Sequence, residues 1–265
     1  MNIFEYDFIL KSFMAGILIS LSIPLVGTIM VSRKSSNLGD ALSHSSLAGV
    51  ALGLIIGINP VVGSILASLF SSIFIDFLRK KFPKNADMAI AIVTSLGVGL
   101  AAVFSDFIPG SKSLNSFLFG SIAAISNIEL LIIFLITITI IFFYIKYYNG
   151  IVYLIFDEKG AKLTGLPVKR LDFLITVFTA LSIGMGSRIV GVLTISSLMI
   201  LPVAGAIKLS NSFKKTVKTS VVLGVSYVVL GLLTSFYLSL KPGGSIVIIG
   251  VLTLILILFF KREKH

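Results

Sequence analysis

Asp40 and His44 are the residues of this chain whose types and spacing best suit the binding of a metal ion. They stand four positions apart, so a helix would place them on one face, about one turn from each other. A carboxylate and an imidazole held this close, away from bulk water, suit a divalent metal such as manganese, zinc or iron. His44 is also the only histidine besides the C-terminal residue. The pair is therefore a candidate metal site.

A structural role for the same pair stays open at the level of sequence. Aspartate is a favoured helix N-cap, and Leu38-Gly39 before it could be a loop, in which case His44 would merely bond a neighbour. Two ligands also do not complete a metal site. The others would have to be water, backbone carbonyls or serine hydroxyls, because there is no cysteine and no further internal histidine. Such an incomplete shell fits a transit site, since a permeating ion must leave again.

The composition of the chain is that of a membrane protein. Of its 265 residues 56% are hydrophobic and only 12% are charged, against about 25% charged in soluble domains. The net charge of +11 sits in short basic clusters between apolar segments, which indicates cytoplasmic loops rather than nucleic-acid binding. The lack of cysteine excludes disulfides and thiolate metal sites. Residues 1–10 lack a basic region, so the first apolar run is interpreted as a membrane helix and not as a signal peptide.

The apolar runs predict an all-α, polytopic membrane protein with about eight or nine transmembrane helices. The count is eight if 171–208 is one long broken helix. Segment 114–126 is too short and too polar to span, and could dip into the membrane or lie along its interface. No loop could hold a separate core, so residues 1–265 are expected to form a single transmembrane domain. The expected spans are residues 8–32, 38–57, 60–78, 87–105, 128–148, 171–187, 189–208, 217–239 and 244–260.

Basic residues follow every second span, which predicts an N-terminus outside the cell and a C-terminus in the cytoplasm. Arg188 is the exception, because this scheme leaves it near the outer side. We expect its side chain to reach lipid headgroups, rather than to form a charged lip that contacts a delivery protein. Asp106 and Glu129 are expected to be solvated, although either could attract cations to an outer mouth.

The second apolar segment cannot be an ordinary lipid-facing helix. Residues 32–46 read SRKSSNLGDALSHSS, which leaves only residues 47–58 as a continuous apolar or small stretch. A lipid-exposed helix needs about 20 such residues, and an aspartate near its centre costs about 2.5–3.5 kcal/mol on insertion scales. The polar half must therefore face protein or a water-filled cavity. Gly49, Gly53 and Gly57 follow at four-residue spacing and are expected to let neighbouring helices approach closely.

The loop FDEKGAKLTGLP, residues 156–167, has the order of a short capped helix. Asp157 and Glu158 stand at its start, lysines follow, and Gly165 and Pro167 can end it. Such a helix in a cytoplasmic loop could insert into a groove on a partner protein. The alternative is a surface helix that lies on the membrane.

Three motifs together carry a resemblance to a known family. GDALSHSSLAGVALG, FDEKGAKLTGLPV and RIVGVLTISSLMILPVAGA (188–206) occur in this order and spacing. The chain resembles, from about residue 12 to 260, the permease subunit of the ABC-type manganese/zinc/iron uptake family. The resemblance implies a type II ABC importer-like fold and a location in a bacterial plasma or inner membrane.

The resemblance also implies partners and residue roles. The permease would work as a dimer with a cytoplasmic ABC ATPase and an extracellular or periplasmic metal-binding protein. Asp40 and His44 match the family residues implicated in metal coordination along the path, so manganese, zinc or iron would be cargo and no cofactor would be permanently bound. The loose family pattern Glu-x-x-Ala-x-x-x-Gly matches Glu158, Ala161 and Gly165, which with Asp157 would couple to the ATPase.

The motifs that are missing agree with this interpretation. The chain has no G-x-x-x-x-G-K-[ST] phosphate loop, so we expect ATP hydrolysis in a separate subunit and no enzymatic activity here. A hydrolytic triad is implausible with one internal histidine and no cysteine. The alternative function is a gradient-driven secondary transporter or channel, which would use the same Asp–His pair as a metal or proton relay.

Overall fold

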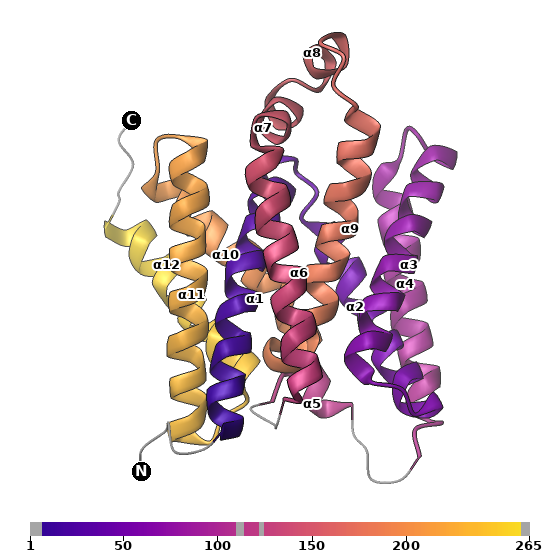
Figure 1. The fold of residues 1–265 in the computed structure, drawn as a ribbon, viewed down its shortest axis with the longest axis vertical. Helices are drawn as coiled ribbons and strands as arrows, with labels where there is room; N and C mark the ends of the chain where they lie inside the picture. The colour runs from indigo at the N-terminus through magenta and orange to yellow at the C-terminus, as the bar shows by residue number, and fades with distance from the viewer. Residues whose placement is uncertain (1–6, 110–113, 122–124, 261–265) are drawn as a thin grey trace.

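The computed structural model describes residues 7–109, 114–121 and 125–260, and every regular element in these ranges is a helix (Figure 1). This confirms the all-α prediction. The elements are α1 (Asp7–Ser32), α2 (Asn37–Ile56), α3 (Pro60–Lys81), α4 (Ala86–Ser105), α5 (Asn115–Leu118), α6 (Asn127–Lys146), α7 (Tyr148–Phe156), α8 (Glu158–Leu163), α9 (Val168–Gly186), the π-helix η2 (Ser187–Gly191), α10 (Val192–Leu209), α11 (Phe213–Leu238) and α12 (Pro242–Phe260).

Eight continuous helical stretches among the described residues are long and apolar enough to cross a membrane. One of them, Val168–Leu209, has 42 residues. A straight helix of that length would measure about 63 Å, twice the thickness of the hydrocarbon core. The chain instead reverses at Gly191, whose φ is +90°, so α9 and α10 are separate crossings. Nine crossings result, as expected for the case in which 171–208 forms two helices.

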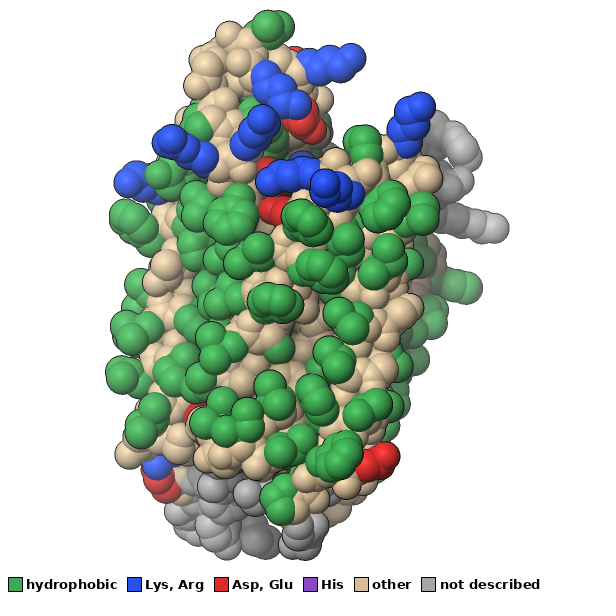
Figure 2. All heavy atoms as spheres, turned by 90° about the vertical axis from the view of Figure 1, so that its right-hand side faces the viewer, with side chains coloured by type: hydrophobic (Ala, Val, Ile, Leu, Met, Phe, Trp, Pro, Cys, Tyr) green, Lys and Arg blue, Asp and Glu red, His purple; other side chains and the backbone are tan. Residues whose placement is uncertain are grey.

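The two ends of the bundle differ in charge (Figure 2). Lysine and arginine side chains gather at one end, above a broad band of hydrophobic side chains. We call this the basic end; it carries the loops after α1, α3, α7 and α10. The other end, called the opposite end, carries Gly57–Pro60, the one-turn helix α5, and η2. Helix α8 projects beyond the basic end, and the chain enters α1 from the opposite end (Figure 1).

Helix α2 is among the most enclosed helices of the bundle. In its apolar window 67% of the residues are buried, against 28% for its neighbour α4 and 22% for α12. It packs most extensively against α3 and α4, and also contacts α9 and α10. Protein therefore covers α2 on several sides, which agrees with the expectation that this helix avoids lipid.

Glycines set the distance between α2 and α3. A Cβ on Gly49 would lie 2.3 Å from the carbonyl oxygen of Gly63 and 2.4 Å from the Ala67 Cβ, so only hydrogen fits there. Gly53 lies against the Pro60 backbone, where a Cβ would come within 3.2 Å. Gly57 differs from the packing role expected for it. Its φ is +81°, it ends α2, and no atom would lie within 4 Å of an added Cβ. Its role is therefore to turn the chain.

Segment 114–126, of which residues 122–124 lie outside the described part, does not cross the bundle. It contains the one-turn helix α5, whose Phe117 is buried. Backbone contacts hold it on η2: Gly120 has φ +77°, and a Cβ there would lie 2.0 Å from the carbonyl oxygen of Ile189. The Ser121 amide donates to the carbonyl of Arg188 at 3.1 Å. The segment thus forms a cover at the opposite end of the bundle.

The expectations for Arg188 and Glu129 were wrong. Arg188 does not extend to headgroups, because its Nη1 lies 3.2 Å from Oε1 of Glu129. The Glu129 side chain is only 3% exposed, so this acid is not solvated. The two ionic groups neutralise each other, which lowers the cost of placing both in an apolar region. Asp106 is exposed, as expected.

The close approach of α2 and α3 leads to a stability prediction. Gly49→Ala should lower the thermal stability of the purified protein by the equivalent of about 1–3 kcal/mol, because the new methyl group overlaps α3. Gly99→Ala on α4 is the matched control, since no atom lies within 4 Å of its Cβ position. Equal melting temperatures for the two variants in the same detergent would contradict the predicted contact.

Candidate functional site

Asp40 and His44 lie on the first two turns of α2, near the basic end. The Nε2 atom of His44 is 3.8 Å from Oδ2 of Asp40. This separation is longer than a hydrogen bond and close to the roughly 3.4 Å between two ligands of a tetrahedral ion with bonds of about 2.1 Å. The Asp40 side chain is 58% exposed and that of His44 is 23% exposed. The pair is therefore both close together and accessible.

The helix-cap alternative does not describe Asp40. The N-cap of α2 is Ser36, and Asp40 lies within the first turn that follows. Its carboxylate lies near the positive end of the helix dipole. His44 lies about 10 Å along the axis from Asn37, or a third of the length of the helix.

A polar hollow adjoins Asp40 between α2 and α4. Its volume is about 450 Å³, and its lining includes Asn37 and Asp40 from α2 and Asp87, Thr94 and Ser95 from α4. Asp87 is thus a second carboxylate beside the pair, which the sequence analysis missed. Its position in the first turn of α4, directly after a basic loop, is the signal that could have found it. The hollow offers oxygen atoms of the kind that bind hard and borderline cations.

Close packing fixes α4 against the pair. A Cβ on Gly97 would lie 2.7 Å from the backbone nitrogen of Ser45 and 2.9 Å from the carbonyl carbon of His44. The backbone of α4 therefore touches the backbone that carries the imidazole.

The serines around the pair use their hydroxyl protons within α2. Ser43 donates to the carbonyl of Gly39 at 2.8 Å, and Ser45 donates to that of Ala41 at 3.0 Å. Both are buried. Bonds of this kind satisfy a serine inside a helix and do not direct it toward a ligand. Among the described residues, no group of three His, Cys, Asp or Glu side chains is close enough to hold a metal ion. One chain alone therefore supplies an incomplete site.

An apolar cluster closes α2 on the side of the pair that faces the opposite end. Leu47 and Leu54 of α2 pack with Phe117 of α5 and Val192 of α10, and all four are buried. We call this cluster the plug; its further members are Ala48, Val50 and Ala101. Leu47 is three residues from His44, so the plug begins one turn from the imidazole. Polar groups therefore lie beside the pair toward the basic end, and apolar side chains lie toward the opposite end, where a further hollow of about 360 Å³ between α2, α3 and α4 is also lined mainly by apolar residues.

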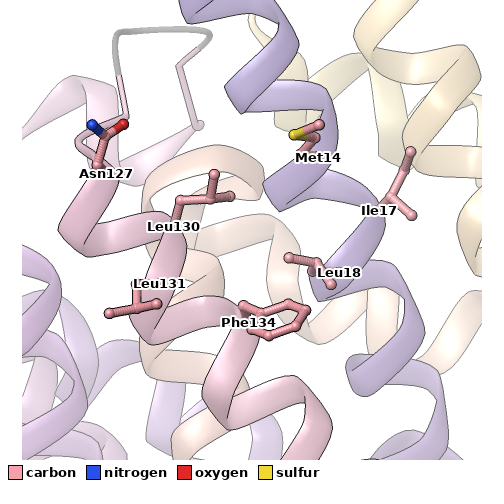
Figure 3. A pocket seen from close by; sticks show the side chains of 7 residues that line it. All are labelled: Met14, Ile17, Leu18, Asn127, Leu130, Leu131 and Phe134. Carbon is pink, nitrogen blue, oxygen red and sulfur yellow. The ribbon is translucent and has the colours of Figure 1, made fainter.

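A second hollow has a different character (Figure 3). It lies between α1 and α6, measures about 460 Å³, and is lined by one polar residue, Asn127, and by Met14, Ile17, Leu18, Leu130, Leu131 and Phe134. Apolar side chains of this kind suit lipid and offer no ligand for a cation. This hollow is therefore not a candidate for the ion site.

The loop helix α8 is built as a short, capped projection. The Asp157 carboxylate accepts from the Gly160 amide at 2.8 Å, and Lys162 pairs with Glu158 at 2.6 Å. Ala161 is the buried residue of α8 itself. Gly165, with φ +78°, turns the chain toward α9. Gly160 was missed by the sequence analysis: a Cβ there would lie 2.1 Å from the Asp157 carboxylate.

Two largely exposed apolar side chains flank α8. Leu163 is 89% exposed and Phe156 is 70% exposed. Leu163 ends α8, whereas Phe156 ends α7 and packs edge-on against Phe213 of α11, with 5.9 Å between the ring centroids. Exposed apolar groups on a rigid, capped helix are typical of a contact site for another protein.

Known proteins resemble this chain over almost its full length. The sequence model of the ABC 3 transport family matches residues 5–261. A "Probable metal transport system membrane protein" of Treponema pallidum is 34% identical over 254 residues, 96% of each chain. The high-affinity zinc uptake system membrane protein ZnuB of Haemophilus influenzae is 27% identical over 98% of this chain and 99% of its own. The manganese transport system membrane protein MntC of Listeria monocytogenes is 25% identical over 99% and 94%.

A solved structure has the same fold. The structure of PsaBC from Streptococcus pneumoniae in complex with Fab contains a chain that superposes with a TM-score of 0.88 at 27% identity, covering 99% of this chain and 95% of that one.

The cap of α8 gives a local prediction. Asp157→Ala removes an N-cap acceptor, which costs about 0.5–2 kcal/mol. Amide hydrogen exchange at residues 160–163 should therefore become about 2- to 30-fold faster. Gly160→Ala should act in the same direction by displacing the carboxylate. Thr139→Ala on α6, which removes a hydroxyl that bonds only within its own helix, is the control. Unchanged exchange in both α8 variants would show that the cap does not hold the helix.

Proposed function

The chain belongs to the ABC 3 transport family and is a membrane-spanning permease subunit of a metal uptake system, in which we propose that Asp40 and His44 bind the transported ion. The observation that supports this role most directly is their geometry: a carboxylate and an imidazole 3.8 Å apart, on an otherwise buried helix, at the edge of a polar hollow. The cargo would be a divalent transition metal. Relatives are named for the uptake of zinc and of manganese, and a carboxylate with an imidazole can bind either ion.

The incomplete site leads us to propose that a second permease subunit supplies the missing ligands. Helix α4 buries only one stripe, which includes Val93, Gly97 and Ala101, and leaves most of its surface uncovered beside the polar hollow. A second subunit placed against this face would bring two Asp–His pairs together. Up to four protein ligands would then surround the ion, with Asp87 near its exit.

We propose that the basic end faces the cytoplasm, following the bias of lysine and arginine toward cytoplasmic loops. The N-terminus would then be outside and the C-terminus inside, in a bacterial plasma or inner membrane. A metal-binding protein would deliver the ion at the opposite end. A separate ATPase would bind α8 through Leu163 and Phe156, with Asp157, Glu158, Ala161 and Gly165 holding the shape of the contact.

Removal of either proposed ligand tests the ion site. Asp40→Ala and His44→Ala should each lower uptake of zinc and manganese by about tenfold or more in a reconstituted complex, since even residues that only support a metal ligand contribute about 10–100-fold. Asp87→Asn should have a smaller effect. Asp7→Ala, an exposed acid paired with Lys11 near the chain start, is the matched control. Normal uptake by both Asp40→Ala and His44→Ala would refute the proposed site.

The contact with the ATPase has its own test. Leu163→Asp should reduce co-purification of the ATPase and abolish ATP-driven uptake, because it places a charge in an apolar contact without disturbing the fold. Leu240→Asp is the control: this leucine is also exposed, at 52%, but lies at the opposite end. Metal transport by the permease alone in liposomes, without ATP, would favour a gradient-driven carrier instead.

A further inference from the structure

A buried ionic cluster at the opposite end reaches the plug. Arg188 of η2 pairs with Glu129 of α6 at 3.2 Å, and its guanidinium lies over the ring of Phe117 at 5.7 Å. Phe117 is the member of the plug that α5 contributes. One side chain thus connects a fixed helix, α6, with the residue that covers the outer side of the Asp40–His44 pair.

The carboxylate of Glu129 is anchored from several directions. Its Oε1 also accepts from Nδ2 of Asn59, the N-cap of α3, at 3.2 Å. Its Oε2 accepts from the backbone amide of Ser126 at 2.9 Å, within a capping box at the start of α6. Three separate parts of the chain therefore meet at a carboxylate that is 2% exposed overall. Charge-assisted hydrogen bonds of this kind are about twice as strong as neutral ones.

The segment that the cluster holds is tied closely to its neighbours. Gly120, Gly191 and Gly243 bring the α5 segment, η2 and the start of α12 into backbone contact, and the Gly243 amide donates to the Phe119 carbonyl at 2.9 Å. Gly191 has φ +90°, directly after a π-helical turn. π-Helical turns are frequent at functional sites, and a glycine at such a φ can absorb a change of direction. Val192, the next residue, belongs to the plug.

We infer that the Glu129–Arg188 ion pair is a latch that keeps the plug closed over the Asp40–His44 pair. Opening a route from the opposite end to His44 requires Phe117 and Val192 to leave Leu47 and Leu54. Phe117 can leave only if Arg188 moves with it or releases it, and Arg188 is tied to α6 by Glu129. The ion pair therefore has to break or shift in the step that admits the ion. Glu129 and Arg188 are positioning residues that do not contact the ion, and this inference rests on the proposed function of the pair.

A unique cysteine can report the state of the plug, because the chain has none. Leu47→Cys places a thiol within the plug, at its member nearest to His44 in the sequence, where the residue is 8% exposed. In membranes that contain the complete transporter without ATP, a membrane-impermeant methanethiosulfonate reagent added from outside should label it slowly. Adding Glu129→Gln should raise the labelling rate by about tenfold, as expected when a charged hydrogen bond is lost. Glutamine can keep the acceptor of the capping box, while its amide nitrogen replaces Oε1 and so removes the charge together with the hydrogen bond from Asn59.

Two controls separate a latch from general loosening. Ser126→Ala weakens the cap of α6 but leaves the ion pair, and should not raise the labelling rate. Asp172→Asn breaks the Arg33–Asp172 ion pair at the basic end, and should also leave the rate unchanged. Should the Glu129→Gln chain fail to assemble, Arg188→Met removes the other partner and should give the same increase.

Unchanged labelling in assembled Glu129→Gln or Arg188→Met chains would overturn the latch, as would an equal increase in Ser126→Ala. The assay measures access and not metal transport. Its failure would therefore leave the proposed metal site standing, and normal uptake by Asp40→Ala and His44→Ala would refute that site without changing the labelling result.

Discussion

An ionisable pair on a membrane helix must be covered by protein or water, and the arrangement of this molecule follows from that requirement. Asp40 and His44 share α2 with a stretch too short to satisfy lipid. The helix is enclosed instead by α3 and α4, at distances that only Gly49, Gly63 and Gly97 allow. Covering α2 in this way still leaves a polar hollow beside Asp40. The packing of the glycines and the accessibility of the pair are thus two results of one constraint.

The molecule treats the two sides of the pair differently. Toward the basic end lies the hollow with Asp87 and Ser95, where a hydrated cation has oxygen partners. Toward the opposite end lie the buried side chains of the plug, which offer a cation nothing and exclude water. Alternating access requires that an ion site be accessible from only one side of the membrane at a time. Polar groups on one side of the pair and apolar side chains on the other are compatible with that requirement.

Helix α9 joins the two regions that such a cycle has to coordinate. It starts directly after α8 and Pro167, and it ends at η2, which carries Arg188. Near its start Asp172 is paired with Arg33, next to α1, so that end is also held. A displacement of α8 by a partner protein would be transmitted along a rigid helix of 19 residues to the turn at Gly191. The short path from α8 to the plug follows from the topology, because α9 alone connects α8 to η2.

The sequence alone was sufficient for the spans, for the capped loop helix and for the exclusion of α2 from lipid, since all three depend on local composition: runs of apolar residues, charges at helix ends, and a polar half-segment. It also suggested Asp40 and His44, because a spacing of four residues fixes their relation within one helix. Tertiary structure decided what depends on residues far apart in the chain. Arg188 and Glu129 are separated by 59 positions and were each expected at a surface, yet they form an ion pair in which Glu129 is buried and Arg188 is partly buried. The place of Asp87 beside the pair and the close contact at Gly97 both depend on the packing of α4 against α2. The role of Gly57 depends on the turn that it makes at the end of α2. Helix formation and residue spacing within a helix depend on neighbours in the sequence. The ion-pair partner of a buried charge depends instead on which helices pack together, so only the tertiary structure identifies it.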